Sequence, residues 1–145
     1  MKYMMMVKLD GNCEDARQYA AGAPPPENFQ QAMGKLIEKM IQSGVWVGAG
    51  GLCPVAEGAR IQVAGGKLSV TDGPYIESKE VIGGYAILEV GSKKEALRWG
   101  EEFMQLHIDL LGSSWEGELE IRPMANLMDG GGCAPQSPAA TSSTL

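Results

Sequence analysis

The stretch YAILEVGSKKEALRWGEEFMQLH, residues 85–107, carries a strand pattern followed at once by a helix pattern. Residues 85–90 place apolar side chains on both faces of an extended chain, as in a strand that is buried on both sides. Ser92 and Glu95 have the S-x-x-E spacing of a capping box, so a helix is expected to begin there. The apolar stripe of that helix consists of Ala96, Gly100, Phe103, Met104 and His107. The stretch therefore predicts a buried strand joined directly to an amphipathic helix.

A second strand and helix are predicted near the start of the sequence. Residues 2–9, KYMMMVKL, again indicate a strand that is apolar on both faces. Residues 10–27 contain glycines and three consecutive prolines and indicate a loop. A helix is expected next, with Asn28 as its N-cap and Gly44 as its terminating residue. Its apolar face comprises Phe29, Met33, Leu36, Ile37, Met40 and Ile41. Residues 45–47 then predict a short strand that runs into a glycine-rich segment.

Residues 60–71, RIQVAGGKLSVT, predict a β-hairpin. Gly65 and Gly66 form a two-residue loop that permits positive φ at both turn positions. Folding at this turn places Ile61, Val63, Leu68 and Val70 on one face, and Arg60, Gln62, Ser69 and Thr71 on the other. The pairing and the polarity pattern agree, so the register is well specified.

The order of the elements predicts an α+β fold. After the second helix, Leu119 and Ile121 alternate with charged residues and indicate a final, half-buried strand. With the hairpin as an insertion, the order is β-α-β-β-α-β, the split unit of ferredoxin-like folds. Two right-handed crossovers place both helices on one face of the sheet. Because the strands at 2–9 and 84–90 are apolar on both faces, we expect a second copy to cover the other face in a symmetric dimer.

Length, charge and cysteine content limit the classes of function. The chain has 145 residues, and we expect one domain over residues 1–125 and a flexible low-complexity tail over 126–145. The net charge is −6 and the 12 basic residues are scattered, which disfavours nucleic acid and membrane as partners. We expect no signal peptide and no membrane-spanning segment. The three cysteines are far apart, which indicates free thiols in a reducing, cytoplasmic setting.

Three separate motifs indicate a family. They are Thr71-Asp72-Gly73-Pro74-Tyr75 with Glu77-Ser78-Lys79-Glu80 and Gly83-Gly84-Tyr85, the opening Met1-Lys2-Tyr3-Met4, and Trp115-Glu116-Gly117-Glu118 with Ile121-Arg122-Pro123. In this respect the chain resembles the YCII-related family over roughly residues 1–125, and in particular the branch named for an Asp-Gly-Pro-Phe (DGPF) motif. Tyr75 stands here in place of the phenylalanine of that motif.

The resemblance implies a dimeric α/β-barrel built from ferredoxin-like subunits. It also implies that no activity is assigned to most members, and that some accompany extracytoplasmic-function sigma factors in a signalling or stress context. The wider family is thought to use a His–Asp pair, and the only histidine here is His107, near the end of the second helix.

The acidic loop around residues 72–79 is one candidate site, with two readings. Asp72 can accept hydrogen bonds from following backbone amides and Pro74 fixes φ, which is sound turn chemistry. Alternatively, the loop lines the mouth of a pocket against the sheet. The groups that would then bind a ligand or transfer a proton are Asp72, Tyr75, Glu77, Ser78 and Lys79. The sequence leaves both readings open.

His107 and a group around Trp115 are the other candidates. His107 is either a hydrogen-bonded core residue or a general acid or base, with Asp72 or Asp109 as its orienting partner. Trp115 and Arg122 are either a packed indole and an exposed ion pair, or ligand-binding residues. The sequence does not say whether Asp72 lies near His107.

No metal or cofactor is expected. The single histidine and the unpaired cysteines argue against a metal site, and Gly48-Ala49-Gly50-Gly51 does not form a dinucleotide fingerprint. Three functions remain. The first is a small-molecule-binding protein, and the second is a metal-free enzyme that uses Asp72 or His107 for proton transfer on a small organic substrate. The third is a module whose role is dimerisation.

Overall fold

The computed structural model describes residues 1–10, 24–73 and 80–126. The predicted ligand-binding loop over residues 74–79 and the predicted tail from residue 127 onward lie outside these residues.

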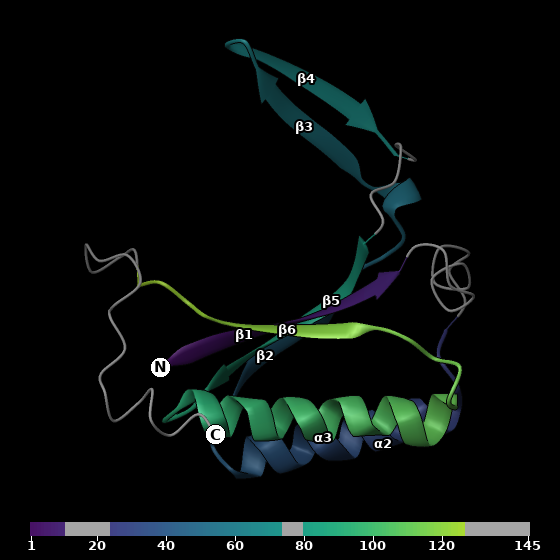
Figure 1. The fold of residues 1–145 in the computed structure, drawn as a ribbon, viewed down its shortest axis with the longest axis vertical. Coiled ribbons are helices and arrows are strands. Elements are labelled where there is room, and N and C mark those ends of the chain that lie inside the picture. Colours follow the sequence, from purple (N-terminus) through teal and green to yellow (C-terminus); the bar gives the residue numbers. More distant parts are fainter. Residues whose placement is uncertain (11–23, 74–79, 127–145) are drawn as a thin grey trace.

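The element order agrees with the predicted one. The elements are β1 (Lys2–Asp10), α2 (Glu27–Gln42), β2 (Trp46–Gly51), the short 3₁₀ helix η1 (Val55–Glu57), β3 (Ala59–Ala64), β4 (Lys67–Asp72), β5 (Glu80–Glu89), α3 (Lys93–Leu111) and β6 (Glu118–Pro123). Four strands form an antiparallel sheet in the order β2-β5-β1-β6, and β3 and β4 form a separate two-stranded sheet. Both helices cover the same face of the four-stranded sheet (Figure 1). The α+β, ferredoxin-like prediction is therefore confirmed.

The helix ends show one correct prediction and one error. Ser92 caps α3, because its Oγ accepts a hydrogen bond from Glu95 N at 3.2 Å, while Glu95 Oε2 accepts one from Gly91 N at 3.1 Å. The predicted N-cap of α2 is wrong, since Pro26 caps that helix and Asn28 lies inside its first turn. Proline supplies a fixed φ at this boundary, and Asn28 Oδ1 accepts a hydrogen bond from Phe29 N at 2.9 Å within the first turn. Gly44, at φ 74°, follows the end of α2 as predicted.

Strand β2 is longer than the sequence suggested. The expected strand ended before the glycines, but Gly50 and Gly51 continue the pairing with β5, opposite Tyr85 and Gly84. Glycine has low strand propensity, yet the hydrogen bonds to a neighbouring strand hold it extended here.

The hydrophobic core lies between the sheet and the helices. Tyr3, Met5 and Leu88 from the sheet pack against Leu36 and Met40 of α2, and Leu88 is fully buried. On α3, Ala96, Gly100 and His107 of the predicted stripe are buried. A Cβ on Gly100 would lie 2.7 Å from Ile121 Cδ1, so the lack of a side chain lets α3 approach β6 closely.

The second face of the sheet, which we call the outer face, carries Met4, Met6, Tyr85 and Ile87. These residues alternate with the core residues along β1 and β5. Among the described residues, no helix covers this face (Figure 1), and Tyr85 is 37% exposed. Charged groups lie along β6, where Glu120 pairs with Lys8 and with Arg122. The prediction that β1 is apolar on both sides is confirmed.

The predicted hairpin forms with the predicted register. Val63 lies opposite Leu68 and Ile61 opposite Val70, and the turn glycines have φ of 58° and 75°. The β3–β4 ribbon projects from the side of the four-stranded sheet opposite the helices (Figure 1). None of the described helices is long and apolar enough to cross a membrane.

Candidate functional site

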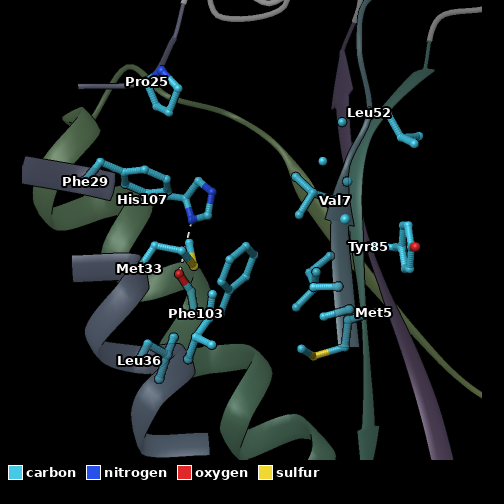
Figure 2. Close-up of a pocket in the computed structure, with 18 of the residues that line it drawn as sticks. Met5, Val7, Pro25, Phe29, Met33, Leu36, Leu52, Tyr85, Phe103 and His107 are labelled. Atoms are coloured by element: carbon cyan, nitrogen blue, oxygen red, sulfur yellow. Dashed lines mark hydrogen bonds between the residues drawn. The ribbon is translucent and has the colours of Figure 1, made fainter. Parts of the chain in front are cut away.

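A cleft of about 990 Å³ opens between the sheet and the two helices. It lies where α2 begins and α3 ends, with Phe29 and Met33 of α2 and Phe103 and His107 of α3 on one wall. Met5 and Val7 of β1 form part of the opposite wall (Figure 2). The cleft is therefore an opening in the same layer that holds the hydrophobic core.

The cleft exists because the strands carry small residues at this level. Ala49 lies opposite Ala86, and Gly51 opposite Gly84, on the sheet face that meets the helices. A Cβ on Gly84 would lie 3.1 Å from Gly50 O, so a side chain would crowd the neighbouring strand. Farther along the same face, large residues such as Leu88 fill the layer completely. The glycine and alanine positions thus set the place and the size of the cleft.

His107 is the polar group of the helix-side wall. Its side chain lies among three aromatic rings, with centroid separations of 4.9 Å to Phe29, 4.8 Å to Phe103 and 4.3 Å to Trp115. The Phe29 and Phe103 contacts are edge-to-face, and the residue is only 5% exposed. This packing fixes the imidazole at the cleft wall, as Figure 2 shows.

The hydrogen bond of His107 determines its tautomer. Nδ1 lies 3.1 Å from the backbone oxygen of Phe103, one turn earlier in α3. A carbonyl oxygen can only accept, so Nδ1 carries the proton and donates. Burial lowers the pKa of His107 below its ordinary value, and the bond to Phe103 opposes this only in part. The imidazole is therefore neutral at pH 7, with an unprotonated Nε2.

Nε2 of His107 has no hydrogen-bond partner among the described residues. In that part of the chain, no fully buried side-chain nitrogen or oxygen lacks a partner. Nε2 must therefore reach the surface of the cleft, where it offers one hydrogen-bond acceptor in apolar surroundings. Such an atom can accept a hydrogen bond from a ligand or take a proton from one.

The predicted partners of His107 are not the ones that orient it. Asp109 is exposed, and its Oδ1 accepts a hydrogen bond from Gln105 Nε2 at 2.9 Å instead. Asp72 is exposed at the end of β4, pairs with Ala59 and does not line the cleft. The backbone oxygen of Phe103 takes the orienting role.

The aspartate motif contains a close backbone contact. A Cβ on Gly73 would lie 2.0 Å from Val55 O, and Gly73 N donates to Gly58 O at 2.7 Å. Gly73 is thus required for the turn to pack against η1, which supports the structural reading of Asp72-Gly73.

The remaining predicted site residues are separated. Trp115 lines the cleft against His107, as a ligand-binding residue would. Arg122 is exposed on the outer face, where its Nε lies 3.6 Å from Glu120 Oε2, so the sheet separates it from the cleft. Tyr75, Glu77, Ser78 and Lys79 lie outside the described residues.

Sequence reasoning missed the sheet side of the cleft. The glycines at 48–51 and 83–84 were the available signal, because glycines facing each other on adjacent strands leave space next to the sheet. Among the described residues, no group of three or more His, Cys, Asp or Glu side chains could hold a metal ion.

The fold and the cleft define a split β-α-β-β-α-β protein with an apolar cavity between its layers. The chain belongs to the YCII-related domain family, whose model matches residues 1–104. No curated protein matched the chain. The resemblance noted in the sequence is thus confirmed at the level of the family. His107 and Trp115 lie just beyond the matched residues, so the match assigns no role to them.

Proposed function

We propose that this protein binds a small, largely apolar molecule in the cleft, and that His107 Nε2 accepts a hydrogen bond from it. The observation that carries this proposal is a neutral imidazole whose free acceptor meets an apolar cleft of about 990 Å³. That volume falls at the upper end of the usual range for ligand sites, about 300–1,000 Å³. A few polar groups in an otherwise apolar wall are what fixes a ligand's orientation.

The composition of the wall favours an uncharged ligand. The described residues that line the cleft include no lysine, arginine, aspartate or glutamate. A charged molecule would lose its hydration there without gaining a partner ion. An aromatic alcohol or a similar donor on an apolar body matches both the wall and His107 Nε2.

The test uses a matched pair of probes and a variant that preserves shape. 2-Naphthol carries a donor, and 2-methylnaphthalene has nearly the same shape without one. His107→Phe keeps a ring among Phe29, Phe103 and Trp115 but removes the acceptor. We expect 2-naphthol to lose about fivefold in affinity in this variant, as one hydrogen bond is worth about 1 kcal/mol, and 2-methylnaphthalene to be unaffected. If neither probe raises the melting temperature of the wild type, binding in this cleft is refuted.

Proton-transfer catalysis is the second candidate for the same cleft. The unprotonated Nε2 of His107 supports it, because a neutral imidazole can act as a general base toward an acidic C–H or O–H. Such a protein would exchange a carbon-bound proton of the ligand for deuterium in D₂O, and His107→Phe would abolish the exchange. If NMR shows no exchange for a ligand that does bind, catalysis is refuted and only the binding role is supported.

We also propose that the protein is a homodimer in which the outer faces of two four-stranded sheets pack together. The apolar side chains of Met4, Met6, Tyr85 and Ile87 support this, because together they form an apolar patch of the kind that commonly marks an interface. Sedimentation velocity at micromolar concentration tests it. A single species of 15.4 kDa would refute the dimer.

We also propose a branch of the family and a cellular role for this protein. The residues Thr71–Tyr75 support membership of the DGPF branch. A cytoplasmic binding protein without turnover would suit the accessory role in sigma-factor or stress signalling that the resemblance implies. If the protein retains a sigma factor only with a 2-naphthol-type ligand bound, and His107→Phe loses this retention, the role is supported. Retention that does not change with ligand or variant argues against it.

A further inference from the structure

The β3–β4 ribbon exposes an entire apolar face. Ile61, Val63, Leu68 and Val70 share this face, and they are 67%, 72%, 74% and 67% exposed. Two-stranded ribbons are marginally stable alone in water and normally pack on another layer. Among the described residues, no element covers these four side chains. We call this surface the ribbon face.

Backbone contacts close the β3–β4 ribbon at its base. Gly58 directly precedes β3 and Gly73 directly follows β4, and Gly73 N donates a hydrogen bond to Gly58 O at 2.7 Å. Gly73 also packs on η1. Leu52 N, just after β2, donates to Gly83 O at 3.0 Å. The ribbon lies on the side of the four-stranded sheet away from the helices (Figure 1).

We infer that the ribbon is an arm whose apolar face packs against a second copy of this chain. The inference rests on the homodimer proposed above, because the second copy is the one that covers the outer face. The ribbon projects on that same side of the sheet, so a second copy seated on the outer face would lie beside the ribbon.

The area of the ribbon face agrees with a dimer contact. At about 25 cal/mol per Å², the transfer energies of Val, Leu and Ile side chains correspond to roughly 60–120 Å² each. Two-fold symmetry repeats the four side chains on two arms, so the arms can bury on the order of 500–1,000 Å². This is a substantial share of the roughly 1,600 Å² that a standard stable interface buries.

The polarity of the ribbon also favours one-sided contact. Its other face carries the polar residues Arg60, Gln62, Ser69 and Thr71, so only the apolar face needs cover. An arm that lies along a partner's flank, with its polar face in water, satisfies both faces.

The test compares two variants of the full-length chain. Val63→Ser with Leu68→Ser changes the ribbon face, and Gln62→Ser with Thr71→Ser changes the polar face of the same strands. Sedimentation velocity across a range of concentrations gives the dimer dissociation constant. We expect the first pair to raise it at least about tenfold and the control pair to leave it unchanged. Hydrogen exchange of residues 59–72 should be slower in the dimer than in the dilute monomer.

The outcomes separate this inference from the dimer itself. A wild type that stays monomeric overturns both. A dimer whose dissociation constant is equal in the two variants overturns the arm alone and leaves sheet-to-sheet pairing in place. Equal exchange protection of residues 59–72 in monomer and dimer overturns it too, because the ribbon face would then be covered from within one chain. Far-UV circular dichroism confirms that both variants fold.

Discussion

Replacing His107 with phenylalanine is expected to remove one pH-dependent contribution to stability. Burial among Phe29, Phe103 and Trp115 lowers the pKa of His107 below 6.5, and the Phe103 hydrogen bond raises it only in part. The unfolded chain recovers the ordinary value. Between the two pKa values the unfolded state binds more protons than the folded state, so the free energy of unfolding falls as the pH drops from 6.5 through the folded pKa.

The magnitude follows from the same linkage. Inside that window the wild type loses up to about 1.4 kcal/mol for each pH unit, and the phenylalanine variant loses nothing at this position. At pH 8 the variant lacks the Nδ1–H bond to Phe103 O, which is worth about 1 kcal/mol. We therefore expect the wild type to be slightly the more stable at pH 8, and this advantage to shrink or reverse by pH 5.

Urea unfolding of both proteins at pH 8, 7, 6 and 5 measures this difference. Glu120 does not interfere, because its hydrogen bond with Lys8 lowers the pKa of its carboxyl, and its contribution is lost only at more acidic pH. Burial and the Phe103 hydrogen bond are the causes of the His107 pKa shift, with no charged side chain among them, and Asp109 is bonded to Gln105. A constant difference between the two proteins from pH 8 to pH 5 would refute the neutral, buried imidazole.

Three further substitutions test the cleft, the turn and the core. Ala49 lines the cleft, so Ala49→Leu should weaken 2-naphthol binding at least about tenfold, as measured by calorimetry. The free energy of unfolding, measured with urea, should change by about 1 kcal/mol or less. Unchanged binding would contradict the site. Gly73→Ala places a Cβ 2.0 Å from Val55 O and should cost about 2 kcal/mol or more, whereas the control Gly34→Ala, with open space around it in α2, should be neutral or stabilising. Leu88→Ala removes a fully buried side chain and should cost about 2–5 kcal/mol in urea unfolding, and a cost near zero would mean that the sheet–helix layer is not packed as described.

The fold was predictable because its signals are local. The glycine pair at 65–66 fixes the hairpin register, and the Ser92–Glu95 box fixes the start of α3. The error at Asn28 arose because Pro26 takes the N-cap position, while Asn28 lies two residues further on and accepts a hydrogen bond from Phe29 N inside the first turn. The predicted strand ended too early, before Gly51, because glycine has low strand propensity and the sequence did not show that pairing with β5 would override it.

The site was predictable only in part, because it depends on which side of the sheet a residue faces. Trp115 and Arg122 are close in sequence, yet one contacts His107 in the cleft and the other lies on the outer face. Asp72 matched a family pattern, but the inserted ribbon carries it away from the cleft. No spacing rule could show that a backbone oxygen, that of Phe103, would take the role expected of a carboxylate.

The glycines of β2 and β5 connect the two proposed surfaces. On the helix side, Gly51 and Gly84 leave room for the cleft. On the outer face, Tyr85 packs directly on Gly50, where a Cβ would lie 2.9 Å from its ring. Figure 2 shows the Tyr85 ring on the far side of the strands from His107. Little more than backbone therefore separates the cleft from the outer face, which we propose packs on a second copy. Larger residues at these positions would fill the cleft and displace Tyr85 together, so the composition of this part of the sheet serves both surfaces at once.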